Sequence, residues 1–207
     1  MTALIDLHFL PSLEYFCALL PYPSILFEKH EHFVKQTFRN RCYIHTAHGK
    51  AMLTIPLAER HGHQPVAAVK IDYRQRWQDH HWRTIESAYR KAPFYEHYAP
   101  DLRDILYRKH TLLFDLNLEM LSFCLAALRW NKKVDCTTAY EAQTPLSVND
   151  LRGVITAKTT YRERDFYEPQ PYYQVFGSTF VANLSILDLL FCSGPDASAL
   201  LQASARK

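Results

Sequence analysis

Residues 33–57, FVKQTFRNRCYIHTAHGKAMLTIPL, carry the clearest local pattern in the chain. The residues on either side of His48-Gly49 alternate between apolar and polar types, as expected for a β-hairpin formed by 41–47 and 51–57. The start of the stretch combines three cations with two amides, namely Lys35, Gln36, Arg39, Asn40 and Arg41. The stretch therefore predicts a hairpin whose leading segment is suited to holding an anion.

The residues before this hairpin predict the start of a parallel sheet. Residues 3–9 are apolar enough for a short strand, and Ser12 can cap a short helix that ends before Pro21. Residues 24–28 then predict a second strand, parallel to the first because a helix joins the two.

The residues after the hairpin predict a third strand and then a helical layer. Residues 66–73 continue the alternation, following a loop at 59–65. From Trp77 the apolar period changes from two to about 3.6 residues, which predicts helices between 77 and 131 with a break at Ala92-Pro93.

The last third of the chain has weaker patterns. It predicts strands at 134–138 and 172–176, helices at 148–155, 184–191 and 196–203, and a loop at 159–171. Asn183 and Ser185 are expected to cap the helix at 184–191. We therefore expect one mixed α/β domain over residues 1–207, with a sheet formed by the N-terminal strands and the hairpin. A helical layer at 77–131 is expected to cover that sheet.

The composition excludes several classes of protein. The formal net charge of +3 is small and dispersed, unlike the concentrated basic face of a nucleic-acid binder. The chain has only five glycines and no glycine-rich phosphate loop, so we expect no cofactor cradled by the backbone.

We expect a cytoplasmic protein that does not insert into membranes. Its five cysteines are widely spaced with no C-x-x-C pair, which is typical of free thiols in a reducing compartment. The N-terminus carries Asp6 and Glu14 where a signal peptide needs an apolar core. The most apolar segment, 111–128, contains Asp115 and Glu119, which disfavour a membrane span.

The cations of the first stretch form one candidate site. Lys35, Arg39 and Arg41, with the amide of Asn40, can hold a phosphate or carboxylate, as a nucleotide-sugar or acyl-phosphate donor would require. The alternative is a solvated surface helix whose cations pair with the nearby glutamates Glu28 and Glu31.

A second candidate lies on the first helix of the helical layer. The apolar period directs His81 into the fold with Ile85, where it can act as a general base whose pKa is tuned by burial. Trp77 and Tyr89 can line the same pocket. Alternatively, His81 is a core histidine with a satisfied hydrogen bond.

Asp188 is a third candidate because it interrupts the apolar run at 184–191. A carboxylate on a buried helix must find a cation or a hydrogen-bond donor, and Arg39 or Arg41 is a natural partner. That pairing would make Asp188 an orienting residue of a catalytic site, and the alternative is a purely structural ion pair.

The histidine pairs and the cysteines are weaker candidates. His30 with His32, and His61 with His63, could bind zinc or iron, but their spacing matches no metal motif, so we predict no metal site. Cysteines such as Cys42 are predicted to be core thiols rather than nucleophiles.

Several segments resemble, in the same order, the WbqC-like proteins of bacteria. They are FLPSLEYF at 9–16, KQTFRNRCYI at 35–44, GKAMLTIPL at 49–57, WQDHHWRTIESAYRKAPFYEHY at 77–98, DLN at 115–117, YYQVF at 172–176 and NLSILDLLFCSG at 183–194. Many relatives open with a His-Gln-Pro-type motif where this chain has HFLP at 8–11, so that only His8 could carry a role of that motif.

The resemblance implies a role in the synthesis of O-antigen or another surface polysaccharide, in which an acyl or aminoacyl group such as glycine is attached to a sugar. We therefore expect a transferase in which Lys35, Arg39 and Arg41 hold an anionic small-molecule substrate and His81 acts as the base. Two alternatives are a non-catalytic accessory factor that binds a sugar nucleotide or a protein of the same pathway, and a metal-dependent enzyme that uses the histidine pairs.

Overall fold

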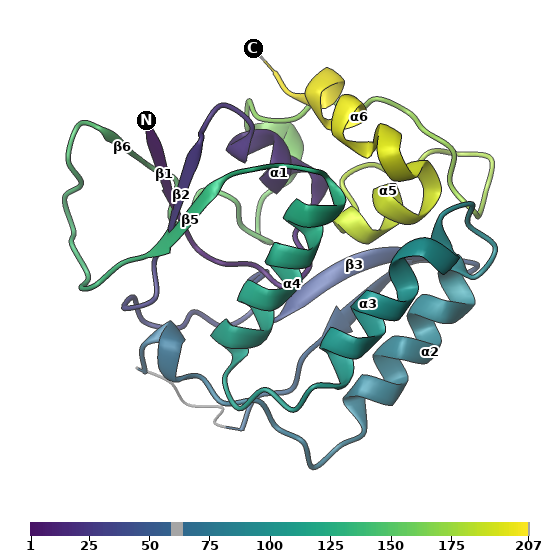
Figure 1. Cartoon of the computed structure of the whole chain (residues 1–207), viewed down its shortest axis with the longest axis horizontal. Helices are drawn as coiled ribbons and strands as arrows, with labels where there is room; N and C mark the ends of the chain where they lie inside the picture. Colours follow the sequence, from purple (N-terminus) through teal and green to yellow (C-terminus); the bar gives the residue numbers. More distant parts are fainter. Residues whose placement is uncertain (59–63, 207) are drawn as a thin grey trace.

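A computed structural model describes residues 1–58 and 64–206, so residues 59–63 of the predicted loop lie outside the described part. The fold is mixed α/β, as predicted, and contains a parallel four-stranded sheet in the order β5-β2-β1-β6 (Figure 1). These strands are Thr2–Ile5 (β1), Ser24–Phe27 (β2), Lys133–Cys136 (β5) and Val148–Asp150 (β6).

The βαβ opening predicted from the sequence is confirmed. The helix α1 (Leu13–Leu19) lies between β1 and β2, which are parallel and pair from Thr2 with Ser24 to Ile5 with Phe27. Every residue of α1 is buried, and the helix packs against α6 (Ala197–Ser204). The central strand β1 is buried after its first residue, which is typical of a parallel strand covered on both faces.

The hairpin forms from β3 (Arg41–Thr46) and β4 (Gly49–Thr54), with Cys42 opposite Leu53. Gly49 has a φ of 94°, a conformation that the turn requires and that glycine adopts without strain. The hairpin is a separate two-stranded sheet and does not extend the parallel sheet. The backbone N–H of Ser185 donates to the carbonyl of Tyr43 (2.7 Å), so a C-terminal segment lies along β3.

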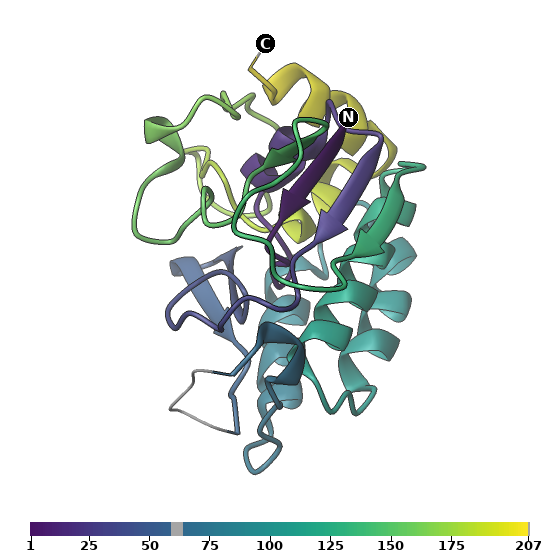
Figure 2. The same ribbon diagram turned by 90° about the vertical axis from the view of Figure 1, so that its left-hand side faces the viewer.

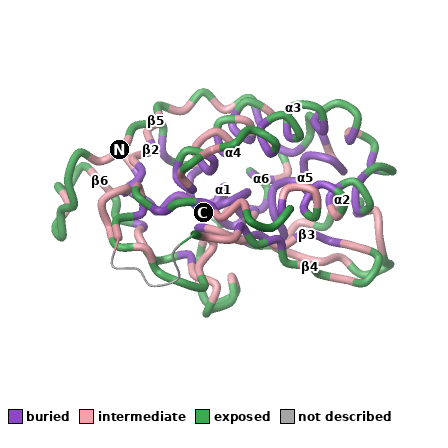
Figure 3. The backbone as a smooth tube through the Cα atoms, turned by 90° about the horizontal axis from the view of Figure 1, so that it is seen from below, coloured by how far each residue is buried: buried purple, intermediate pink, exposed green. Residues whose placement is uncertain are grey.

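The predicted helical layer consists of three helices that lie side by side (Figures 1 and 2), namely α2 (Trp77–Tyr89), α3 (Tyr95–Tyr107) and α4 (Leu113–Ala127). The predicted stripe of Trp77, His81, Ile85 and Ala88 is buried, and α2 packs against β3. Buried residues concentrate on the inward-facing sides of the elements (Figure 3). No helix among the described residues has the length and apolar character needed to cross a bilayer.

The C-terminal part contains α5 (Ile186–Ser193) and the 3₁₀ turn η3 (Gly194–Asp196), followed by α6. Ser185 caps α5, as predicted, and its hydroxyl accepts a hydrogen bond from Leu187 N–H (3.4 Å). Gly194 has a φ of 51°, and the ring of Phe94 lies directly against its Cα, so only glycine fits there.

The strand predicted at 66–73 is not formed. The structure has a 3₁₀ turn, η1 (Val66–Ala68), and then an extended segment with isolated bridges at Lys70 and Ile71. Val66 and Val69 are both buried, and their spacing of three residues suits a 3₁₀ turn rather than a strand. The apolar residues of this loop are buried in the core, and their spacing produced the apparent alternation in the sequence.

Two further predictions in the last third were wrong. Residues 148–155 begin as the parallel strand β6 and continue as a turn through Gly153, where a helix was predicted. The apolar pair Leu151 and Ile155 is buried, which produced the helix-like spacing. Residues 172–176 form no strand, although the side chains of Tyr172 and Gln174 both point inward to hydrogen-bond partners. The 159–171 loop, as predicted, has little regular structure, with a single 3₁₀ turn η2 (Tyr161–Glu163).

Candidate functional site

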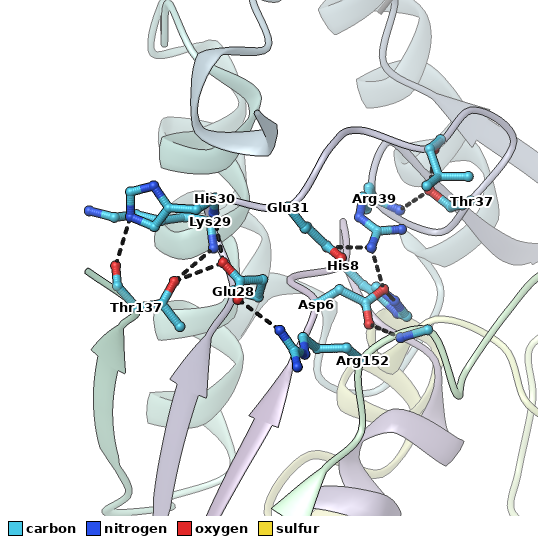
Figure 4. Close-up of polar contacts among 12 residues, drawn as sticks. Asp6, His8, Glu28, Lys29, His30, Glu31, Thr37, Arg39, Thr137 and Arg152 are labelled. Carbon is cyan, nitrogen blue, oxygen red and sulfur yellow. Dashed lines mark hydrogen bonds and ion pairs between the residues drawn. The ribbon is translucent and has the colours of Figure 1, made fainter. Parts of the chain in front are cut away.

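Several charged side chains gather where the parallel strands end (Figure 4). Asp6 directly follows β1, Glu28 directly follows β2, and Arg152 lies shortly after β6. In parallel sheets, ligands bind outside the carboxyl ends of the strands, because the connections that leave the sheet there are free to carry function.

Glu28 ties the ends of three strands together. It is fully buried, and its carboxylate accepts hydrogen bonds from the Thr137 hydroxyl (2.9 Å) and the His30 backbone N–H (2.8 Å). Arg152 Nη1 lies 3.1 Å from Glu28 Oε2, and the same guanidinium forms a fork with Asp150. These contacts fix the position of Arg152 at the edge of the sheet.

Asp6 is the second anchor of this edge. Its carboxylate lies 2.9 Å from His8 Nε2 and 3.3 Å from Arg39 Nη2, and it accepts a hydrogen bond from Gly153 N–H (2.9 Å). Burial alone would raise the pKa of Asp6, but His8, Arg39 and Gly153 N–H together hold it well below its usual range. Asp6 is therefore an ionised carboxylate at neutral pH.

Arg39 links this buried carboxylate to a second one that faces the solvent. Its side chain is only 4% exposed, and it forms ion pairs with both Asp6 and Glu31. The backbone carbonyl of Arg39 accepts a hydrogen bond from Asn117 Nδ2 (2.7 Å), which holds the segment against α4. Figure 4 shows Asp6, Glu31 and Arg39 pointing toward one another.

Burial raises the pKa of Glu31, and the carboxylates of Asp6 and Glu28 add to this rise, against the lowering by Arg39. The Glu31 side chain is 16% exposed, so it is in contact with solvent while being partly desolvated. A carboxylate with these properties can accept a proton near neutral pH more readily than an ordinary glutamate.

Glu31 and Arg39 open into a cavity of about 420 Å³, which we call the sheet-edge cavity. Its charged and aromatic lining comes from the segment between β2 and β3, from the connection between β5 and β6, and from the end of β6 with the residues that follow it: Glu31, Arg39, Tyr140, Asp150, Arg152 and Lys158. Thr37 and Thr156 add hydroxyl groups. The cavity therefore offers both signs of charge and several hydrogen-bonding groups, which suits a polar ligand such as a sugar.

A second cavity of about 280 Å³, the hairpin cavity, lies beside the first. Its lining includes Phe38, Arg41, Tyr43, Lys50, Tyr161 and Arg164. Ala157 lines both cavities, so they are neighbours on either side of the segment that carries Arg39 and Arg41.

The predicted cationic cluster is thus divided between two cavities. Arg39 lines the sheet-edge cavity and Arg41 lines the hairpin cavity. The Asn40 side chain donates to the carbonyl of Ile55 (2.9 Å) and holds the hairpin instead. Lys35 is exposed and is not among the described residues that line either cavity.

His81 lies at a third cavity, which it lines with Trp77 and His80. It is 2% exposed, its Nε2 lies 3.1 Å from the carbonyl oxygen of Thr54, and its ring packs edge-on against Trp77. Burial lowers the pKa of His81 to about 4, so the imidazole is neutral. The alternative of a core histidine with a satisfied hydrogen bond fits the contact of Nε2, while Nδ1 is buried without a hydrogen-bond partner.

We predict that His81 makes the protein less stable in weak acid. Because its pKa falls from 6.5 to about 4 on folding, the unfolded state gains a proton first as the pH falls. The loss of unfolding free energy from this residue between pH 7 and pH 5 is expected to be about 2 kcal/mol. Denaturant titrations should show a smaller loss for His81→Gln than for the wild type and for the exposed control His80→Gln. Equal pH dependence in all three proteins would contradict the prediction.

Asp188 does not form the predicted ion pair with Arg39 or Arg41. It is fully buried, and within the described residues its carboxylate accepts hydrogen bonds from Tyr89 (2.9 Å), Tyr172 (2.7 Å) and Gln174 (2.7 Å). Burial raises the pKa of Asp188. The aromatic hydroxyl groups supply the donors that a buried carboxylate needs, so no arginine is required.

Asn183 was expected to cap α5 and instead serves α1. Its Oδ1 accepts a hydrogen bond from Glu14 N–H (2.9 Å), and its Nδ2 donates to the Glu14 carboxylate (3.2 Å). Asn183 has a φ of 53°, a left-handed conformation that asparagine tolerates better than most residues. This geometry joins the starts of α1 and α5.

The remaining candidates are the cysteines and the histidine pairs. Burial raises the pKa of Cys42, and it raises that of Cys192 to about 12, so both thiols stay protonated. In the described part of the chain, no three His, Cys, Asp or Glu side chains are grouped to hold a metal ion. His61 and His63 lie outside that part.

The sequence reasoning missed the roles of Asp6, Glu28 and Arg152. The strands were predicted at 3–9 and 24–28, which placed Asp6 inside the first and Glu28 at the end of the second. In the structure the two strands end at Ile5 and Phe27, so each carboxylate directly follows its strand. Parallel strands align their carboxyl ends, so both carboxylates should lie at one edge. Arg152 could not be placed, because its strand was predicted to be a helix.

Comparison with known proteins identifies the family of this chain. No curated protein and no solved structure matches it significantly. A family model described as the WbqC-like protein family matches residues 7–161. This range includes the cations that line the two cavities, except Arg164, and it ends before Asp188. Because the match covers most of the 207 residues, the chain belongs to the WbqC-like protein family.

Proposed function

We propose that this protein is an acyl- or aminoacyl-transferase that acts on a sugar intermediate of surface polysaccharide synthesis, and that the sheet-edge cavity binds the acceptor sugar. The reaction class is taken from the role that the resemblance to WbqC-like proteins implies, and the family match supports the membership on which that role rests. The location follows from chemistry, since the cavity lies at the carboxyl ends of parallel strands and presents carboxylates, guanidinium groups and hydroxyl groups.

The observation that carries this proposal is the environment of Glu31. Its carboxyl lines the cavity, its pKa is raised by burial, and Arg39 holds it in one orientation while being held in turn by Asp6. A positioned carboxylate with a raised pKa is a general base suited to neutral pH. We assign this role to Glu31 in place of His81, which lines a different cavity.

The proposed reaction begins when the Glu31 carboxylate takes a proton from an acceptor hydroxyl or amine of the sugar. The oxygen or nitrogen attacks the carbonyl carbon of an activated acyl donor such as an acyl phosphate, and a new ester or amide bond forms. The bond to the leaving group breaks, the leaving group departs with the electron pair as an anion, and Glu31 passes its proton to water. Arg39 acts as a positioning residue for Glu31.

A binding-only role in the same pathway is the second candidate. The guanidinium groups of Arg39 and Arg152 are both committed to carboxylates, so neither is free to bind the charge that develops in an acyl transfer. In that case the cavity would hold a sugar without catalysing a reaction on it.

The Glu31→Gln variant separates the two candidates. If Glu31 is the base, the substitution is expected to slow transfer by about 100-fold or more, because a glutamine side chain accepts no proton. Mass spectrometry of surface polysaccharide from a strain carrying this variant should show the same loss of acyl groups as a strain without the protein. Glu96→Gln, an exposed glutamate on α3, is the matched control and should leave acylation intact.

Normal acylation with Glu31→Gln, together with its loss in the deletion strain, would favour the binding-only role. If the deletion strain retains all acyl groups, the proposed reaction is wrong. Thermal unfolding of the purified variant must show a folded protein for either conclusion to hold.

A further inference from the structure

The hairpin cavity has an unbalanced charge. Three cations line it, namely Arg41, Lys50 and Arg164, and the described residues that line it include no carboxylate. The buried carboxylate of Glu14 neutralises the charge of Arg164, whose Nη2 donates a hydrogen bond to Glu14 Oε2 (2.8 Å). The other two cations therefore leave an excess of positive charge facing the cavity.

Arg41 and Lys50 have no carboxylate partner in the described part of the chain. The Arg41 guanidinium donates to the backbone carbonyl of Gln36, and its Nε is buried without a hydrogen-bond partner. The Lys50 ammonium lies 4.3 Å from the centre of the Tyr43 ring. Lys50 is exposed and Arg41 is half-buried. A half-buried cation usually has an anionic partner, so a bound anion within reach of both side chains would complete the arrangement around Arg41.

The backbone around the cavity is left-handed at two positions, one of which is strained. Leu10 has a φ of 41° and Asn183 a φ of 53°, and both line the cavity. For leucine, the left-handed conformation is a clear outlier. Strain of this kind concentrates at ligand sites, where the surrounding structure maintains it. The Ser12 hydroxyl, also in the lining, is buried without a partner and can donate a hydrogen bond to a ligand.

The shape and walls of the cavity limit the ligand. Phe38, Tyr43 and Tyr161 supply aromatic surface against which a sugar or base can pack. A volume of about 280 Å³ is at the lower end for ligand sites, so the cavity suits a small phosphate ester rather than a dinucleotide.

We propose that the hairpin cavity binds the phosphate group of a small phosphate monoester, such as a sugar phosphate or a pyrimidine nucleoside monophosphate. Arg41 and Lys50 hold the phosphate, and the aromatic side chains contact the ring. Because Ala157 lines both cavities, this ligand lies next to the sheet-edge cavity. Its use as donor or acceptor in acyl transfer rests on the proposed function, but its binding does not.

Isothermal titration calorimetry with the full chain tests this site. The probes are glucose 1-phosphate, uridine 5′-monophosphate and inorganic phosphate, with glucose and uridine as uncharged controls. The phosphate esters should bind more tightly than inorganic phosphate, and glucose and uridine should not bind detectably. Binding should weaken as NaCl is added, because salt screens the ion pairs. The ester that binds more tightly shows whether the site prefers a sugar phosphate or a nucleoside monophosphate.

Arg41→Gln and Lys50→Gln are each expected to weaken ester binding by about tenfold or more, since each removes a charge-assisted hydrogen bond to phosphate. Lys91→Gln removes an exposed cation elsewhere and should leave the affinity unchanged. The two test residues are on different strands of the hairpin, so the two variants test the phosphate site independently of each other. Glu31→Gln should keep full phosphate binding, which separates this site from the proposed reaction.

Three results would overturn the proposal. They are the absence of ester binding to the folded wild-type protein at millimolar concentration, equal affinity for uridine and its monophosphate, and equal ester affinity in the wild type and both charge-removing variants.

Discussion

Replacing Asp188 with alanine is expected to lower the free energy of unfolding by about 4 kcal/mol, measured by chemical denaturation at pH 7. The fully buried carboxylate accepts hydrogen bonds from Tyr89, Tyr172 and Gln174. Alanine leaves these buried donors without an acceptor, and each unsatisfied donor costs about 1–3 kcal/mol. Relaxation of the neighbouring loop at 172–176 should offset part of the summed cost of the three unsatisfied donors.

Two further variants test this explanation. Asp165→Ala removes a carboxylate that is 94% exposed and paired with Arg206, so stability should hardly change. Asp188→Asn keeps the size of the side chain and one acceptor oxygen, and its loss should be about half that of alanine. If Asp188→Ala is no less stable than Asp165→Ala, the hydrogen-bond network does not stabilise the fold.

The pH dependence gives an independent readout of the same residue. Burial raises the pKa of Asp188, so the folded protein holds this proton more tightly than the unfolded chain does. The free energy of unfolding contributed by this residue therefore falls as the pH rises from the usual range of aspartate toward the raised pKa. This part of the pH dependence should be missing in Asp188→Asn.

The elements with strong periodicity could be predicted from the sequence. The stripe through Trp77, Ile85 and Ala88 and the alternation around His48-Gly49 depend on near neighbours in the chain, and both are present in the structure. The predictions for residues 66–73 and 148–155 were wrong for the opposite reason. Their conformations depend on distant partners, such as the pairing of Thr2 with Val148, which local pattern does not reveal.

The candidate site could be predicted only in part. Arg39 was selected because it is one of several cations close together in sequence. Its ion pair with Glu31 matches the alternative of pairing with nearby glutamates, whereas its ion pair with Asp6 was not predicted. For Asp188 the expected partner was a cation. The structure supplies Tyr172 and Gln174 from an irregular segment, and no periodicity marks such a segment as a source of donors.

Replacing Arg39 with methionine is expected to lower the free energy of unfolding by about 3–5 kcal/mol. Methionine keeps much of the aliphatic volume but removes the charge between Asp6 and Glu31, and Arg39 is only 4% exposed. The variant would leave the buried carboxylate of Asp6 without the positive charge of Arg39. Most of the loss of unfolding free energy should arise from this carboxylate. Arg74→Met, at an exposed arginine that forms a fork with Asp72, is the control and should change stability little.

A double variant shows whether the loss comes from the charges. Adding Asp6→Asn to Arg39→Met removes the uncompensated carboxylate, so the double variant should be more stable than Arg39→Met alone. The wild type should also lose stability below about pH 4, where Asp6 begins to protonate in the unfolded state but not in the folded one. That acid loss should be smaller in Arg39→Met, because the guanidinium no longer favours the ionised carboxylate. An additive double variant would mean that Arg39 stabilises the fold through packing.

Arg39→Met also tests the role assigned to Glu31, through the pH dependence of acyl transfer. Arg39 lowers the pKa of Glu31 against the effect of burial, so its removal should raise that pKa further. A general base is active when deprotonated, and the rate therefore rises as the pH increases through its pKa. The rising limb of the pH–rate profile should move to higher pH in Arg39→Met and stay in place in Arg74→Met. A lower rate with an unshifted profile would show that Arg39 supports folding only and that another group is the base.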